Sequence, residues 1–185
     1  MAVKQINIPY TPRAAFKPFH EREARWGCLV AHRRAGKTVA AINDIIRRAM
    51  LKKGIYALIA PFRAQIKAVA WEYLKHYAFQ VMKQANEAEL MVSLVNGSVI
   101  RLFGADNPDS LRGLGFDGVY MDEYGDFKPS VWGNVIRPTL SDKKGWAVFG
   151  GTPKGHNQFY DIVRVAQETD GGFFLRLPAS ESQLL

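Results

Sequence analysis

The stretch from Ala31 to Thr38, which reads Ala-His-Arg-Arg-Ala-Gly-Lys-Thr, is the feature that most constrains how this chain can fold. An apolar run typical of a buried strand precedes it, and a helical pattern over residues 39–50 follows. A loop in this position points free backbone N–H groups and the positive end of a helix dipole at an anion. Its ending matches the phosphate-binding pattern G-x-x-x-x-G-K-[ST], in which Lys37 would reach the β- and γ-phosphates and Thr38 would ligate Mg²⁺.

This match is partial. Ala31 replaces the first glycine of the pattern, and two arginines lie inside the loop. The simpler alternative is a basic loop ahead of an ordinary helix, but the flanking strand and helix favour a phosphate loop. The residues predicted to surround the phosphates are Ala31, His32, Arg33, Arg34, Ala35, Gly36, Lys37 and Thr38.

Length and composition favour one globular domain. The chain has 185 residues, of which 48% are hydrophobic and 23% charged. No apolar run approaches the roughly 20 residues of a membrane span, and the N-terminus lacks a signal-peptide core. The single cysteine, Cys28, cannot form an internal disulfide and is expected in a buried strand. We therefore expect an intracellular protein.

The net charge of +8 is unevenly distributed. Residues 1–90 contain 16 Lys and Arg against 6 Asp and Glu, whereas residues 91–185 contain 9 against 11. A basic half suggests a polyanionic partner, nucleic acid first. General solubility explains the charge as well. The cations of residues 47–53 are a candidate contact for nucleic acid, with a solvated surface as the alternative.

Strand patterns alternate with helical patterns along the chain, which predicts an α/β fold with a mostly parallel central sheet flanked by helices. Asn96-Gly97 between two strand patterns predicts an inserted β-hairpin with a type I′ turn. One helix should place Ile66, Val69, Ala70, Tyr73, Leu74 and Tyr77 on a single face. The expected strands are 26–31, 56–60, 90–95, 98–103, 118–121, 146–149 and 173–177, and the expected helices are 39–50, 62–80, 130–136 (stopped at Pro138) and 159–165.

Three motifs follow strand patterns, and in parallel sheets ligands bind at the carboxyl ends of strands. One is the loop carrying Lys37. The second is Asp122-Glu123, where Asp122 would hold Mg²⁺ and Glu123 would polarise the attacking water as a general base. An acid pair at a strand end can also be purely structural. Together with a phosphate loop, it is typical of hydrolysing motors and helicases rather than small-molecule kinases and GTPases. The third is Gly151-Thr152-Pro153.

The Thr152 hydroxyl would bond the Glu123 carboxylate or the water and relay the state of the γ-phosphate. A plain turn is the alternative for this segment. Arginine supplies transition-state charge in ATP hydrolysis. Arg33 and Arg34 are candidates inside the loop, and Arg112 could reach a neighbouring subunit's nucleotide. The alternative for Arg112 is pairing with Asp109 or Asp117 in its own loop.

The first 25 residues are basic and aromatic, and their three prolines prevent a long helix. Two interpretations remain open. Aromatic residues such as Phe16 and His20 could stack on a nucleotide base, or the segment could be a surface strap whose aromatic side chains are buried.

Together these motifs resemble the ATPase domain of the large terminase subunit of tailed bacteriophages, over about residues 9–180. The resemblance is carried by the aromatic lead Tyr10 to His20, the loop Arg33 to Thr38, Arg112-Gly113, Asp122-Glu123 and Thr152-Pro153-Lys154-Gly155. It implies a P-loop NTPase of the acid-pair class, with an additional catalytic glutamate, that hydrolyses ATP with Mg²⁺. Its implied catalytic residues are Lys37, Arg33, Arg112 and Glu123, with Thr38 and Asp122 at the metal.

The resemblance further implies that Gly151, Thr152 and Pro153 couple hydrolysis to movement and that Phe16 and His20 lie near adenine. A glutamine is usual near the base in related helicases, and His20 stands in its place. The chain would be a single domain over residues 1–185, with an adenine-side arm at 1–25 and a core at 26–185. The family's C-terminal nuclease domain would be absent, so no DNA cleavage is expected.

Implied partners are double-stranded DNA, the portal protein and procapsid, the small terminase subunit, and further copies in a ring, a pentamer by resemblance. The excised fragment alone could be monomeric. The implied location is the host cytoplasm, without membrane association. Two rivals are a helicase-like nucleic-acid-dependent ATPase, which needs a second motor domain or single-strand stacking platforms, and a non-hydrolysing nucleic-acid-binding or assembly module with a degenerate phosphate loop.

Overall fold

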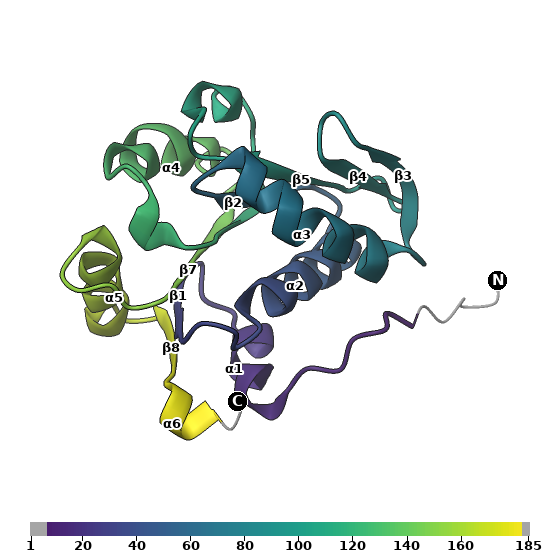
Figure 1. The fold of residues 1–185 in the computed structure, drawn as a ribbon. Helices are drawn as coiled ribbons and strands as arrows, with labels where there is room; N and C mark the ends of the chain where they lie inside the picture. The colour runs from purple at the N-terminus through teal and green to yellow at the C-terminus, as the bar shows by residue number, and fades with distance from the viewer. Residues whose placement is uncertain (1–6, 183–185) are drawn as a thin grey trace.

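An eight-stranded sheet forms the centre of the protein, as a computed structural model shows; the residues described are 7–182 (Figure 1). The strand order is β3-β4-β5-β2-β6-β7-β1-β8. From β5 to β8 all neighbours are parallel, whereas β3 and β4 continue the sheet antiparallel. The strands are β1 Trp26–Ala31, β2 Ile55–Ala60, β3 Met82–Asn86, β4 Met91–Leu94, β5 Val99–Gly104, β6 Gly118–Met121, β7 Trp146–Gly151 and β8 Phe173–Leu177.

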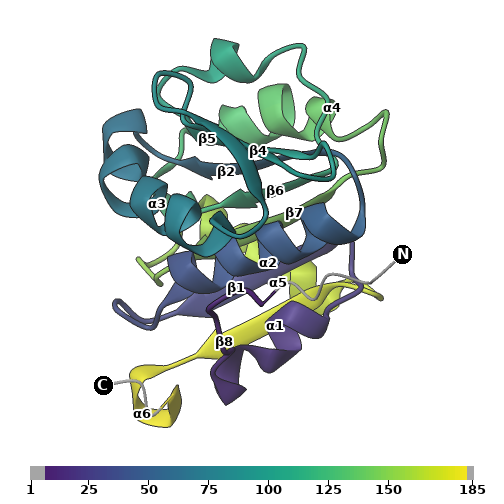
Figure 2. The same cartoon turned by 90° about the vertical axis from the view of Figure 1, so that its right-hand side faces the viewer.

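Helices cover both faces of the sheet, which is why its central strands are continuously apolar rather than alternating (Figures 1 and 2). The long helices α2 and α3 and the N-terminal α1 cover one face, and α4 and α5 cover the other. The helices are η1 Ala14–Phe16, α1 Lys17–Glu21, α2 Lys37–Leu51, α3 Arg63–Ala78, η2 Pro108–Leu111, η3 Tyr124–Asp126, the π-helix η4 Trp132–Ile136, α4 Arg137–Thr139, α5 Gln158–Glu168 and α6 Ala179–Ser182. Within residues 7–182, none of these helices is long and apolar enough to cross a membrane.

The predicted α/β class is confirmed, and the hairpin is present, but its turn is not of type I′. A type I′ turn needs positive φ at both central residues. Only Gly97 has it, at +83°, and Asn96 does not. The Gly97 amide donates to Leu94, which gives a type I turn followed by a glycine bulge. Strand β3 had no sequence prediction, because its alternation is weak and most of its side chains are partly or fully exposed.

Two helix predictions need correction. The helix predicted to stop at Pro138 continues through it to Thr139. The wider turns of the π-helix η4 precede Pro138, so the missing N–H of proline falls where the backbone pattern is already altered. In α3, Val69 and Tyr73 do not lie on the buried face: they are 48% and 45% exposed, and Trp71 takes the core position instead.

The N-terminal segment is a strap on the α2 side of the sheet. Phe16 and Phe19 are buried in the core beneath α2. Behind them, the Asp44 carboxylate of α2 is 1% exposed and faces His20, Arg22, Arg47 and Arg48.

The two shortest of these ion pairs are 2.8 Å to Arg22 and 2.9 Å to Arg48. Burial raises the pKa of Asp44, but its bonds to His20 and the arginines outweigh this effect and lower the pKa to about 2. Burial lowers the pKa of Arg22 to about 10, while Asp44 opposes that change. We call Asp44 with His20, Arg22, Arg47 and Arg48 the strap cluster. Arg47 and Arg48 are therefore engaged in holding the strap.

Candidate active site

Three loops meet at the carboxyl edge of the sheet because β6, β7 and β1 are neighbours in it. Each strand is parallel to the next, so the chain leaves all three at the same edge. The phosphate loop follows β1, Asp122-Glu123 follows β6, and Thr152 follows β7. The structure thus brings the three motifs singled out in the sequence into one site.

The phosphate loop ends in a left-handed residue, Gly36, with φ +93°. Gly36 is the N-cap of α2, and no side chain caps the helix there. The first N–H groups of α2 therefore face the loop, where an anion can accept from them. Lys37 opens the helix, and its Nζ lies 3.2 Å from the carbonyl oxygens of both Ala31 and His32. These contacts hold the ammonium over the loop rather than out in solvent.

The acid pair begins at the end of β6. Asp122 accepts a hydrogen bond from the Thr38 hydroxyl at 2.8 Å. Burial raises the pKa of Asp122, and the Thr38 bond opposes that rise. A hydroxyl and a carboxylate this close fit the oxygen ligands that Mg²⁺ prefers, so Thr38 and Asp122 are suited to hold that ion.

Glu123 has an unusual backbone for a non-glycine residue, with φ +49°. Such backbone strain at a residue beside a cavity is typical of functional positions. Its carboxylate Oε1 lies 3.6 Å from Lys37 Nζ. The Thr152 hydroxyl lies between the two: it accepts from Lys37 at 3.2 Å and donates to Glu123 at 3.4 Å. The predicted approach of Thr152 to Glu123 is therefore present in the structure.

Gly151 belongs to β7, and a Cβ on it would press on the Phe159 ring at 2.9 Å. The glycine thus lets α5 pack close behind the Thr152 segment. Pro153 lines a separate cavity on the α5 side.

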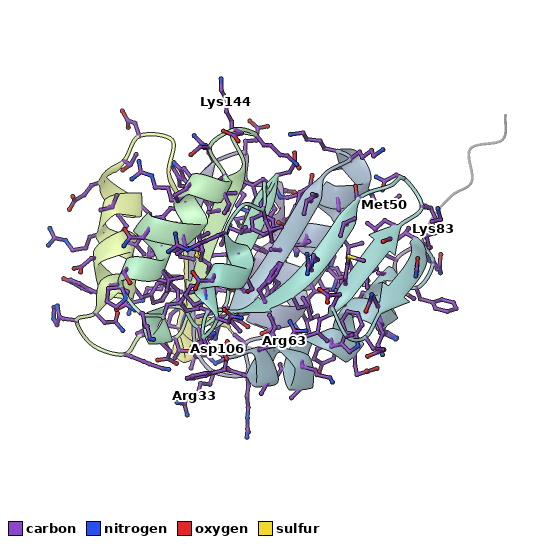
Figure 3. All side chains as sticks on the ribbon, turned by 90° about the horizontal axis from the view of Figure 1, so that it is seen from above. Arg33, Met50, Arg63, Lys83, Asp106 and Lys144 are labelled. Atoms are coloured by element: carbon purple, nitrogen blue, oxygen red, sulfur yellow. The ribbon has the colours of Figure 1, made fainter. Side chains whose placement is uncertain are left out.

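Arg33 and Arg34 both line the cavity over the phosphate loop, and both are exposed. Arg34 has φ +64°, which turns the loop sharply between the two. Arg33 lies at the edge of the molecule opposite Lys144, which precedes β7 (Figure 3). Both arginines therefore lie beside the phosphate loop.

Arg112 does not line the phosphate-loop cavity. Its side chain is 60% exposed and pairs with Asp109 at 2.8 Å, the local pairing that the sequence left as an alternative. Within one chain, Arg112 lies in a different cavity beside Asn134 and Asp142.

The structure does not support an adenine contact by Phe16 or His20. Phe16 is buried in the core, and His20 is enclosed between Tyr10 and Asp44, with its Nε2 2.9 Å from the Tyr10 hydroxyl. Both side chains lie in the strap rather than in the cavity lining. The strap does reach the loop through Arg13, whose Nη1 donates to the Ala35 carbonyl at 3.3 Å.

The cavity over the phosphate loop has a volume of about 600 Å³ and includes residues that the sequence reasoning missed. Asp126 and Lys154 form an ion pair at 2.5 Å on one side. Helix α3 supplies the other side. The sequence signal for this wall is a second stripe of residues at i, i+4 and i+8 along α3, next to the buried face. The α3 residues in the lining are Gln65, Val69 and Tyr73.

The chain is similar to known proteins over most of its length. A family model described as terminase large subunit, T4likevirus-type, N-terminal, matches residues 28–183. The chain belongs to the terminase large subunit family. The large subunit of Thermus virus P23-45 is 30% identical over 176 residues, covering 84% of this chain and 36% of that protein. The large subunit of Escherichia phage T5 is 27% identical over 136 residues, covering 70% and 31%. The chain thus spans about a third of the length of these terminases.

Solved terminase structures share the fold. The large terminase ATPase domain of Thermus phage P74-26 has a TM-score of 0.77 at 27% identity, covering 94% of this chain and 83% of that one. The large terminase of a thermophilic bacteriophage, solved in complex with ADP, has a TM-score of 0.70 at 14% identity, covering 93% and 45%. At that identity the second likeness establishes the fold alone. The predicted P-loop NTPase fold is confirmed.

Proposed function

We propose that this terminase domain hydrolyses ATP, with Mg²⁺ as cofactor, and that hydrolysis drives double-stranded DNA into a viral procapsid. The observation that carries the proposal is the contact series from Lys37 Nζ through the Thr152 hydroxyl to Glu123 Oε1. In this series a cation suited to phosphate, a relay hydroxyl and a carboxylate suited to act as a base belong to one hydrogen-bonded group. The ADP complex of the thermophilic bacteriophage terminase supports nucleotide binding by this fold.

Each residue then has a physical task. The N–H groups at the start of α2 and the Lys37 ammonium neutralise the phosphates and the charge that develops in the transition state. Thr38 and Asp122 would hold Mg²⁺, which would supply positive charge to offset that of the phosphates. Glu123 takes the proton of the attacking water. Thr152 contacts both Lys37 and Glu123, so a change in either can be transmitted to β7.

Steady-state ATP turnover tests the proposal. Replacing Glu123 by Gln keeps the size of the side chain and removes the base, so turnover should fall by about 10²–10⁴-fold while nucleotide affinity is kept. Glu168→Gln, at the exposed end of α5, is the matched control and should leave turnover unchanged. Equal turnover by the Glu123→Gln variant and the wild type would refute the assignment of the base.

The arginine that completes the site is proposed to come from a second subunit. Arg112 is exposed and lies outside its own chain's nucleotide cavity, which suits a residue that acts in trans. In the assembled full-length protein, Arg112→Ala should lose hydrolysis and keep nucleotide binding. Mixing it with Glu123→Gln subunits should restore part of the turnover. Absence of rescue in a confirmed assembly would leave Arg33 or Arg34 as the finger, acting in cis.

The activity of the whole protein is also a proposal, because this chain spans about a third of its relatives. We propose that it acts in the host cytoplasm as part of a homo-oligomeric ring, with double-stranded DNA, the portal and procapsid, and the small terminase subunit as partners. A packaging assay with full-length protein, procapsids and DNA tests this. ATP turnover without any DNA protection from nuclease would separate a simple ATPase from a packaging motor.

A further inference from the structure

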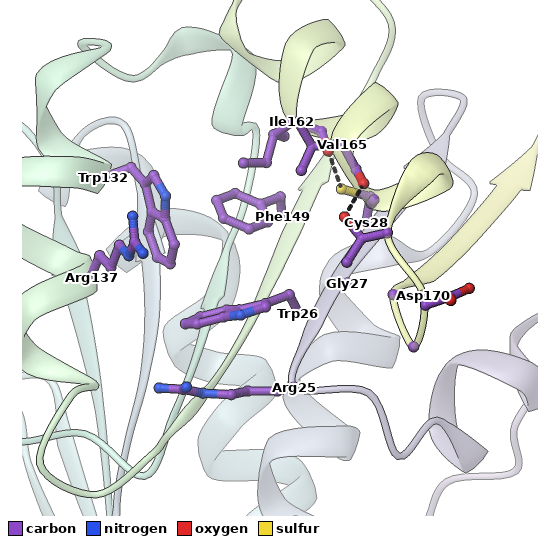
Figure 4. A pocket seen from close by; sticks show the side chains of 14 residues that line it. Arg25, Trp26, Gly27, Cys28, Trp132, Arg137, Phe149, Ile162, Val165 and Asp170 are labelled. Atoms are coloured by element: carbon purple, nitrogen blue, oxygen red, sulfur yellow. Dashed lines mark hydrogen bonds between the residues drawn. The ribbon is translucent and has the colours of Figure 1, made fainter.

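A second cavity lies at the other end of β1 from the phosphate loop (Figure 4). Trp26, at the start of this strand, forms one wall, and α5 and the helical segment η4–α4 form the others. The cavity has a volume of about 370 Å³, within the roughly 300–1,000 Å³ typical of ligand sites. None of the residues assigned above to nucleotide chemistry lines it.

The walls of this cavity are aromatic and aliphatic. Trp132 meets both Trp26 and Phe149 edge-to-face, with ring centroids 5.5 Å and 4.7 Å apart. Ile162 and Val165 of α5 complete the apolar lining (Figure 4). Val165 is 55% exposed, which extends the apolar surface from the cavity to its rim. Rigid aromatic walls beside an exposed aliphatic rim are suited to take up one apolar side chain of a partner.

Two arginines give the rim a positive charge. The Arg25 guanidinium lies 4.5 Å from the Trp26 ring centroid. Among the described residues, it donates to the backbone carbonyls of Leu140 and Gly145 and to no carboxylate. Arg137 forms no ion pair or side-chain hydrogen bond with any of residues 7–182. Asp170 is the single carboxylate in the lining. Within the described part of the chain, the two guanidinium groups therefore have no acidic partner, and they attract anionic groups next to the apolar walls.

We propose that this cavity is a docking site for an acidic peptide segment of a protein partner. One aromatic or aliphatic side chain of the segment enters between Trp26, Trp132 and Val165. Flanking carboxylates of the segment bind Arg25 and Arg137. Charge complementarity favours this occupant. A nucleic-acid backbone could meet the two arginines but would leave the apolar walls without a matching group.

This inference is independent of the proposed ATPase function. The cavity and the nucleotide site lie at opposite ends of β1, and the lining of the cavity shares no residue with the phosphate loop. A Lys37→Ala variant should therefore dock the peptide with the affinity of the wild type. Its loss of nucleotide binding and a failure of peptide docking are separate results.

Tryptophan fluorescence of the full chain provides the test, because Trp26 and Trp132 line the cavity. The probe is a ten-residue peptide with one phenylalanine flanked by four aspartates. Two comparison peptides carry asparagines for the aspartates or alanine for the phenylalanine. We expect saturable binding of the first peptide and at least about tenfold weaker binding of the other two, the equivalent of one lost charge-assisted contact or apolar anchor.

Variants locate the contact. Arg137→Glu should weaken binding of the acidic peptide at least about tenfold. Lys128→Glu makes the same charge change on an exposed residue outside the cavity and should leave binding unchanged. Ala166→Leu should fill part of the cavity and therefore also weaken binding of the peptide. Thermal unfolding checks that each variant is folded. Because Arg137 is exposed, its variant keeps the test valid if Ala166→Leu does not fold.

Three results would overturn the proposal. The first is equal binding of the aspartate and asparagine peptides. The second is Arg137-dependent binding of a DNA oligonucleotide instead of the peptide. The third is self-association of the chain that Arg137→Glu abolishes, with no peptide bound.

Discussion

The nucleotide site and the strap cluster both join cations to a carboxylate on or beside α2, but they do so in opposite ways. At Asp44 the carboxylate is enclosed, and two arginines contact one of its oxygens within 2.9 Å. At Glu123 a single ammonium stands 3.6 Å away, beside a cavity of about 600 Å³. The first arrangement leaves no position for a substrate. In the second, the contact between Lys37 and Glu123 can be replaced: Lys37 can bind a phosphate, and Glu123 can bind a water.

This difference indicates that one group of charges maintains the fold, whereas the other is suited to bind a ligand. A buried carboxylate with a full set of partners is costly to disturb, because removing one partner leaves an uncompensated charge. A carboxylate that is loosely paired and partly exposed, as Glu123 is, contributes little to stability and is free to act on a ligand. The largest and smallest effects expected from mutation follow from this contrast.

The largest effect on nucleotide binding should come from Lys37→Ala. Truncating one partner of a desolvated charge pair costs about 2–5 kcal/mol, or roughly 30- to 4,000-fold in Kd. Titration with a fluorescent ATP analogue measures the loss. The free energy of unfolding should change by no more than about 1 kcal/mol, since the Lys37–Glu123 pair is loose. Unchanged nucleotide affinity would contradict the role of Lys37 at the phosphates.

Asp44→Asn should show the reverse pattern. It leaves Arg22 buried without its counter-charge, so the free energy of unfolding should fall by about 3–5 kcal/mol. Denaturant unfolding measures this, and Asp161→Asn on the exposed side of α5 is the control, with a cost under about 1 kcal/mol. Nucleotide affinity of the folded protein should stay within a few-fold of the wild type. A loss of affinity as large as that of Lys37→Ala would break the contrast between the two regions.

Acid should remove the contribution of the Asp44 carboxylate to the free energy of unfolding. Its pKa is lowered from 3.8 to about 2 in the folded state, so its stabilisation is complete above 3.8 and is lost as the pH falls through 2. The difference in unfolding free energy between the wild type and Asp44→Asn should therefore shrink by about 2 kcal/mol between pH 5 and pH 2. Denaturant unfolding at several pH values measures it. A difference that is constant with pH would mean that Asp44 titrates normally.

The smallest effect should come from Tyr120→Phe, between the two regions. The Tyr120 side chain packs edge-on against Phe19 of the strap, and its backbone lies two residues before Asp122. Its hydroxyl is buried beside Gly150 and has no hydrogen-bond partner among residues 7–182. Removing it should leave the free energy of unfolding unchanged or raise it by up to about 1 kcal/mol. A loss above about 1 kcal/mol by calorimetry would mean that the hydroxyl has a partner.

Local sequence patterns were sufficient for much of the site. Gly36-Lys37-Thr38 and Asp122-Glu123 follow buried strands, and parallel strands deliver their carboxyl ends to one edge. The environment of His20 could not be predicted in this way. It depends on Asp44, 24 residues away along the chain, which reaches His20 only because the strap packs behind α2.

The sequence by itself determined the fold class, the phosphate loop and the acid pair, because each depends on residues close together in the chain. Only the tertiary structure decided that Thr152 also contacts Lys37, that Tyr73 lines the cavity over the phosphate loop, and that Arg112 stays outside it. These positions depend on the order of strands in the sheet and on which face each helix covers. Both are set by packing between segments far apart in sequence, and no local pattern encodes them.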